Sequence, residues 1–127
     1  MKYPSWYAIF VGSLVILFWG GLILSGNVPE FESEPLAIAL HIMAEVGMAT
    51  TLLAGGWGVL KARGWGRPGL LVGLGMLIYS AVSSAGYYAQ AGNWSIVLLF
   101  AAILASAVLV VYRVILAKPA DFKRHGR

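Results

Sequence analysis

The sequence predicts an all-α, polytopic integral membrane protein in which four transmembrane helices form an up-down-up-down bundle. Three observations support this prediction. The chain of 127 residues is 60% hydrophobic and only 11% charged, its mean hydropathy is +0.82, and four long apolar runs follow one another. Apolar runs of about 18 residues or more with few charges are typical of membrane-spanning helices. A soluble core of this size could not bury so many apolar side chains, so we expect a single transmembrane domain over residues 1–127.

The four expected spans cover residues 6–25, 36–60, 68–90 and 94–116. Each is close to the ~20 residues that a ~30 Å hydrocarbon layer requires at ~1.5 Å of rise per residue. The first apolar run is longer than the ~7–15 residues of a signal-peptide core, so we expect it to be a span. Short loops join the later spans, which makes neighbouring spans antiparallel.

Charged residues predict the orientation of the bundle. The loop before the second span holds Glu30, Glu32 and Glu34 and no base, whereas bases gather in the loop after that span and in an expected tail at residues 117–127. Because Lys and Arg collect on the cytoplasmic side, both termini should be cytoplasmic and the acidic loop outside, in a prokaryotic-type cell membrane. The net charge of +4 then faces anionic lipid headgroups, and nucleic acid is not an expected partner.

Small residues predict close contacts between the helices. Glycine residues recur in the second and third spans, at Gly47, Gly55, Gly56, Gly58, Gly69 and Gly73. In lipid such residues let helix backbones approach one another, because little hydrophobic drive acts between helices there. A transport pathway through only four spans would need further copies of the chain, so we expect a homo-oligomer or a larger membrane complex.

His41 and Glu45 are the polar residues of the second span that call for an explanation. They lie four residues apart on one helix face, with Cβ atoms ~5–6 Å apart, and Glu45 is the only acid in any expected span. A charged side chain near the bilayer midplane costs about 2.5–3.5 kcal/mol on insertion scales, so Glu45 should be protonated, paired or in contact with water. Desolvation favours the neutral form of each group, whereas their mutual contact favours the charged pair. Either outcome makes the pair sensitive to protonation.

The third span supplies the predicted neighbours of this pair. When residues advance ~100° each, Tyr79, Ser83 and Tyr87 fall within one narrow arc, and antiparallel packing places Tyr79 at the depth of Glu45. We therefore predict a polar lane that binds a proton or ligand in the outer half of the bundle, formed by His41, Glu45, Tyr79, Ser83 and Tyr87. Ser80, Ser84 and Tyr88 widen this lane. Hydroxyls in spans also bond their own backbone or a neighbouring helix, so ordinary packing is the alternative role for these serines and tyrosines.

A small membrane transporter or channel is the function that these residues favour, with Glu45 binding a proton or cation and His41 tuning it. One alternative is an accessory or structural subunit of a membrane complex, in which the pair fixes helix register. Another is a redox subunit, with a quinone at His41 and a tyrosine, or with a metal held by His41 and Glu45 from two copies. A bis-histidine haem site within one chain is excluded, because His41 is the only histidine in any span.

No sequence motif indicates an enzyme or names a cofactor. The chain contains no phosphate-binding loop, Walker pattern or HExxH sequence. Ser83 or Ser84 near His41 would imitate a catalytic dyad, but such neighbours in a bundle are more often simple hydrogen-bond partners. The sequence therefore favours a non-enzymatic function and assigns no catalytic residue, cofactor or substrate.

Overall fold

Four long helices make up most of the molecule. The computed structural model describes residues 2–120, and its long helices are α1 (Lys2–Leu24), α3 (Pro35–Leu60), α4 (Gly66–Gln90) and α5 (Trp94–Leu116). The short helix α2 (Glu30–Ser33) lies in the loop between α1 and α3. Each long helix is long and apolar enough to cross a membrane. The predicted all-α bundle of four candidate membrane spans is confirmed.

Proline and glycine mark the ends of several helices. Pro35 occupies the first turn of α3, where its missing N–H costs no hydrogen bond. Gly26 after α1 and Gly92 after α4 adopt φ angles of 71° and 77°, a left-handed conformation that glycine takes without steric cost. α1 and α4 begin before the expected spans at residues 6 and 68, because the first turn of each helix carries polar or charged residues that precede the apolar run.

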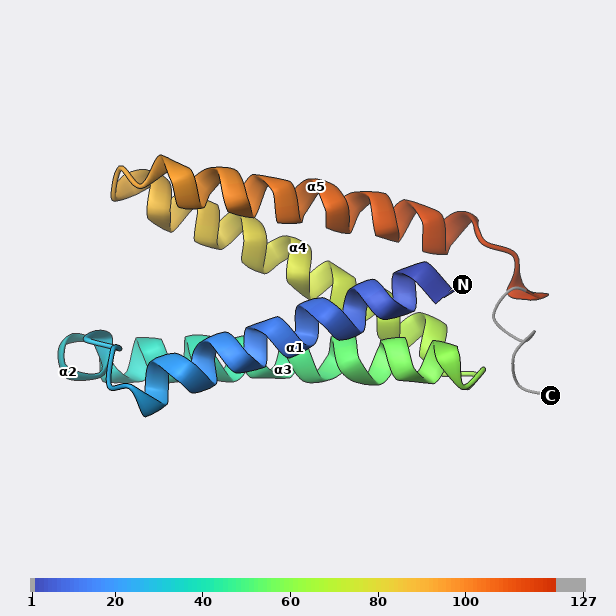
Figure 1. Ribbon diagram of the computed structural model, residues 1–127, viewed down its shortest axis with the longest axis horizontal. Helices are drawn as coiled ribbons and strands as arrows, with labels where there is room; N and C mark the ends of the chain where they lie inside the picture. The colour runs from blue at the N-terminus through green and yellow to red at the C-terminus, as the bar shows by residue number, and fades with distance from the viewer. Residues whose placement is uncertain (1, 121–127) are drawn as a thin grey trace.

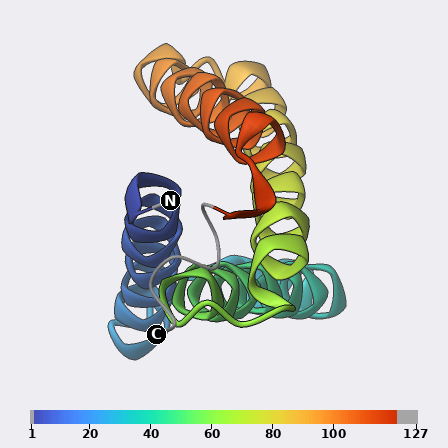
Figure 2. The ribbon, with the colours of Figure 1, turned by 90° about the vertical axis from the view of Figure 1, so that its right-hand side faces the viewer.

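The helices pack in chain order and leave one side of the bundle open. α1 lies against α3, α3 against α4 and α4 against α5, whereas α1 and α5 touch only slightly. Figure 1 shows α1 and α3 side by side, with α4 crossing away from α3 towards α5. The end view in Figure 2 shows the wide gap between α1 and α5. The two halves of the bundle therefore converge at the end that holds the N-terminus and separate towards the end that holds α2.

Glycines bring the C-terminal half of α3 into backbone contact with both of its neighbours. A Cβ added at Gly55 would stand 2.4 Å from the amide nitrogen of Leu70 in α4, and one added at Gly56 would stand 2.7 Å from the carbonyl oxygen of Ser5 in α1. By contrast, a Cβ added at Gly47 would meet nothing within 4 Å. Only part of the glycine set in the second span therefore serves close packing, and that part lies at the end of the bundle away from α2.

The buried core lies beside these glycines. Five large apolar side chains have no exposed surface: Leu52, Leu70, Leu74, Val110 and Val114. Towards α2 the core ends at Met48 of α3 and Leu77 and Ala81 of α4, which are 2%, 4% and 2% exposed. Beyond this layer α3 and α4 diverge, and the side chains between them become polar.

Two contacts join α1 to α5 at the closed end of the bundle, which is the end that holds the N-terminus. The hydroxyls of Tyr7 and Ser106 lie 2.7 Å apart. Because the Ser106 hydroxyl donates to the carbonyl oxygen of Ile103, Tyr7 is the donor in its bond to Ser106. The guanidinium of Arg113 in α5 lies 5.6 Å from the ring centroid of Tyr3 in α1, a cation–π contact. These contacts hold the first and last helices together where the bundle is narrowest.

Charge is divided between the two ends of the bundle. At the closed end, Arg67 at the start of α4 donates to the carbonyl oxygens of Val114 and Ile115, at 3.3 and 3.1 Å. A cation at the C-terminus of α5 also interacts favourably with the helix dipole. The acids Glu30, Glu32 and Glu34 lie at the opposite end, in α2 and the residue before α3. Residues 121–127 of the expected basic tail lie outside the described part of the chain.

Replacing Gly55 by alanine should destabilise the bundle by ~1–3 kcal/mol, because the new methyl group forces the backbone of α4 away from α3. Gly47→Ala is the matched control, since its methyl group enters open space and its higher helix propensity should leave stability unchanged or raise it by up to ~1 kcal/mol. Thermal unfolding in detergent micelles, followed by circular dichroism, measures both variants. Equal stability of the two would contradict the close contact between α3 and α4.

Candidate functional site

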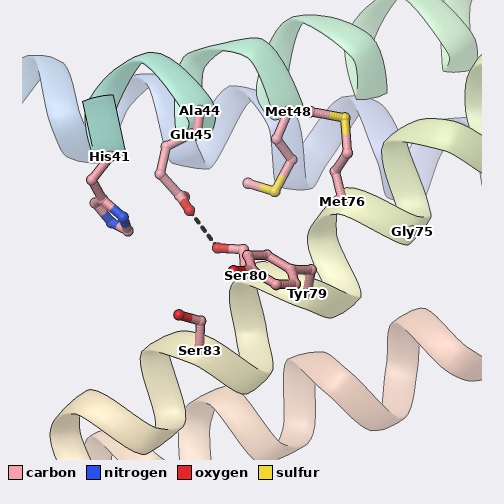
Figure 3. Close-up of a pocket in the computed structure, with 9 residues that line it drawn as sticks. All are labelled: His41, Ala44, Glu45, Met48, Gly75, Met76, Tyr79, Ser80 and Ser83. Atoms are coloured by element: carbon pink, nitrogen blue, oxygen red, sulfur yellow. Dashed lines mark hydrogen bonds between the residues drawn. The ribbon is translucent and has the colours of Figure 1, made fainter. Parts of the chain in front are cut away.

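An open pocket of about 350 Å³ lies between α3 and α4, where the two helices begin to separate (Figure 1). Its α3 wall consists of residues three and four positions apart, which share one helix face. The two walls are formed by His41, Ala44, Glu45 and Met48 from α3 and by Gly75, Met76, Tyr79, Ser80 and Ser83 from α4. Figure 3 shows His41 and Glu45 directed from α3 into the space in front of α4. Four of the five residues of the predicted polar lane therefore meet around one pocket.

Glu45 reaches from the middle of α3 to α4. The Ser80 hydroxyl donates a hydrogen bond to Oε1 of Glu45, drawn as the dashed line in Figure 3. Glu45 is partly buried and is the only acid within the four long helices. It lies ~15 Å along α3 from Pro35 at ~1.5 Å per residue, close to the middle of the span. The serine hydroxyl replaces part of the hydration that a carboxyl group loses at this depth.

His41 lies one turn closer to α2 and makes a different contact. Its ring meets the ring of Trp19 in α1 edge to face, with centroids 5.7 Å apart and planes at 71°. Within residues 2–120, no hydrogen bond or ion pair joins His41 to Glu45. His41 thus lines the pocket and also contacts α1, whereas Glu45, one turn along α3, contacts α4. In the sequence, Trp19 differs from the other tryptophans in lying away from the ends of the expected spans. That position alone did not predict its contact with His41.

The α4 residues of the predicted lane divide between the pocket and the surface beyond it. Tyr79 and Ser83 line the pocket, and Tyr79 is 77% exposed. Tyr87 does not line the pocket; it packs edge to face on Tyr88, with ring centroids 5.2 Å apart. Ser80, expected only to widen the lane, is the residue that contacts Glu45. The crossing of α4 over α3 decides which side of α4 faces Glu45, and a residue pattern within one helix does not specify that crossing.

Hydroxyls elsewhere in α3 bond their own helix. Thr50 Oγ1 donates to the carbonyl oxygen of Val46 at 2.8 Å, and Thr51 Oγ1 donates to that of Gly47 at 2.7 Å. Bonds to the carbonyl four residues earlier are a common arrangement for threonine in apolar helices. These two side chains serve α3 locally and do not line the pocket.

The pocket combines a few polar groups with apolar walls. Glu45 accepts hydrogen bonds or a proton, the ring nitrogens of His41 donate or accept hydrogen bonds, and the hydroxyls of Tyr79, Ser80 and Ser83 do the same. His41 and Glu45, the metal ligands considered from the sequence, belong to no cluster of three or more His, Cys, Asp or Glu side chains within the described part of the chain. The arrangement suits the binding of a proton, a cation or a small polar group.

Comparison with known proteins identifies a matching family. The family described as "Domain of unknown function (DUF8058)" matches residues 1–125. No curated protein and no solved structure matches the chain. The matched region contains all four long helices and every residue of the pocket, so the site lies within the matched domain.

The Ser80→Ala variant should move the infrared carboxyl band of Glu45, because it removes the one hydrogen bond that this carboxyl accepts from a side chain in residues 2–120. Ser83→Ala is the matched control, since Ser83 lines the same pocket without bonding Glu45. The band is assigned by its disappearance in Glu45→Gln, with all proteins compared in lipid at one pH. A band that moves equally in both serine variants, or in neither, would contradict the contact.

Proposed function

The chain belongs to the family of the domain of unknown function DUF8058, and we propose that it is a small membrane transporter or channel in which Glu45 binds and releases a proton or cation. The observation behind this proposal is a partly buried carboxyl, midway along a candidate span, that lines an open pocket and is hydrogen-bonded to Ser80. Acidic residues inside membrane spans are expensive to insert and often mark ion or substrate pathways.

The neighbours of Glu45 suit reversible binding. The Ser80 hydroxyl donates to the carboxyl oxygen, and the same hydroxyl can turn to accept when Glu45 carries a proton. His41 lines the pocket one turn nearer to the end that holds α2, so it lies on the path between Glu45 and that end. A pocket of about 350 Å³ has room for several waters at ~30 Å³ each. These waters would carry protons between His41 and Glu45.

The proposal includes an orientation and a partner. Lys61, Arg63 and Arg67 lie at one end of the bundle, and the acids of the α2 region lie at the other. The positive-inside rule then supports cytoplasmic termini, with the pocket opening towards the outer side. α1 and α5 touch only slightly, so the bundle has one side on which its helices are not packed together. A second copy of the chain that packs there would complete the bundle in a homo-oligomer.

A second candidate is an accessory subunit of a larger membrane complex. The observation that favours it is the exposure of two tyrosines of α4, Tyr79 at 77% and Tyr87 at 62%, because aromatic side chains are enriched at protein interfaces. In such a subunit the contact between Glu45 and Ser80 would fix the register of α3 against α4. Glutamine at position 45 keeps a hydrogen-bonding oxygen for Ser80, so Glu45→Gln would then be functionally silent.

In a transporter or channel, Glu45→Gln should abolish proton- or cation-driven flux, because glutamine cannot take up and release a proton. Flux is measured in proteoliposomes that enclose a dye sensitive to pH, Na⁺ or K⁺, under an imposed gradient of the same ion, against protein-free liposomes. Glu32→Gln is the matched control, since it removes an acid from α2, outside the long helices, and should retain flux. Wild-type flux in Glu45→Gln would support the accessory subunit instead.

The orientation is testable by chemical labelling, because the chain contains no cysteine and a single engineered cysteine is the only thiol. In intact cells a membrane-impermeant maleimide should label Glu32→Cys directly. The same reagent should label Lys61→Cys only after the membrane is permeabilised. The reverse pattern would place both termini outside.

A further inference from the structure

The pocket at Glu45 is larger than an inorganic ion requires. Its volume of about 350 Å³ compares with ~30 Å³ for one water, and it falls in the range of about 300–1,000 Å³ that is typical of sites for small organic molecules. A bare ion at Glu45 would leave most of this space to water or lipid. An organic ligand would fill it and bring its own apolar surface into contact with the walls.

The walls suit an apolar body of variable shape. Met48 and Met76 face the pocket from opposite helices, with Ala44 and Gly75 beside them. Thioethers are polarizable and unbranched, so they adapt to ligands of different shapes. The exposed ring of Tyr79 adds an aromatic face, which attracts organic cations. None of these side chains is a good ligand for a hard inorganic cation, which prefers carboxylate and carbonyl oxygens.

The charges in and around the pocket favour a cation. Glu45 is its only carboxyl group, His41 and Tyr79 are its other titratable residues, and no Lys or Arg lines it. The described bases near helix ends lie at the closed end of the bundle, whereas Glu30, Glu32 and Glu34 lie at the end towards which α3 and α4 separate. Acids at that end raise the local concentration of cations and repel anions.

We propose that the ligand of this pocket is a small organic cation, a protonated or quaternary amine with an apolar body. Its charged nitrogen lies beside the Glu45 carboxylate, which keeps its hydrogen bond from Ser80. Its apolar body lies against Met48 and Met76 and beside the ring of Tyr79, which also lines the pocket. This assignment rests on the proposed function of Glu45, and it names the class of molecule that the site binds.

Three probes of similar shape and different charge test the proposal: benzyltrimethylammonium, its uncharged carbon analogue neopentylbenzene, and the anion benzylsulfonate. Equilibrium dialysis measures their binding to the full-length protein in lipid nanodiscs, with empty nanodiscs as the reference for partition into lipid. Only the cation should bind above this reference. Glu45→Gln should weaken its binding by at least about tenfold, as expected for loss of a charge-assisted contact, whereas Glu32→Gln, which removes one of three acids outside the pocket, should weaken it far less.

A second variant keeps the test valid if Glu45→Gln does not fold. Gly75 lines the pocket, and a Cβ added there meets nothing within 4 Å, so Gly75→Leu should fill the space without disturbing the bundle. It should abolish binding of benzyltrimethylammonium. Wild-type binding in either variant, or binding of the uncharged or anionic probe as strong as that of the cation, would overturn the proposal.

The outcomes separate this proposal from the function on which it rests. Flux of H⁺, Na⁺ or K⁺ that depends on Glu45, in a protein that does not bind benzyltrimethylammonium, would overturn the organic cation alone. The absence of both Glu45-dependent flux and cation binding would overturn the proposed function as well.

Discussion

The close approach of α3 to both of its neighbours is the contact on which the rest of the structure depends. Gly55 meets the backbone of α4 and Gly56 meets that of α1, at distances where a single added carbon would collide. In lipid little hydrophobic drive holds helices together, so such backbone contact, and the dispersion that accompanies it, must supply much of the association. The buried leucines and valines of the core gather beside these two glycines.

Tight packing at one end accounts for the pocket at the other. Because α4 contacts α3 closely at Gly55 and crosses it at an angle, the two helices diverge towards α2 (Figure 1). The apolar core ends at Met48 and Leu77, and the next turn of each helix holds Glu45 and Ser80. Helices that stay apart leave room for water or a ligand, which lets a carboxyl group remain at mid-span at lower cost than in packed hydrocarbon. The same geometry therefore stabilises the fold and creates the site.

The division of polar groups within the pocket matters for its chemistry. Glu45 is held by a neutral hydroxyl of α4, and His41 rests against an indole of α1. Neither group has a partner charge in the described part of the chain, so no salt bridge ties up the carboxyl group on which the proposed binding of a cation or proton depends.

The sequence by itself determined the four helices, their antiparallel order and the acid in the second span, because run length, loop length and composition are properties of the chain alone. The sequence also predicted that His41, Glu45, Tyr79 and Ser83 belong to one polar lane, and all four line one pocket in the structure. Only the tertiary structure decided that Ser80 contacts Glu45, that Trp19 contacts His41 and that Tyr87 lies beyond the pocket. The physical reason is that residue spacing sets angles within one helix, whereas partners across helices depend on the crossing angle that the glycine contacts impose.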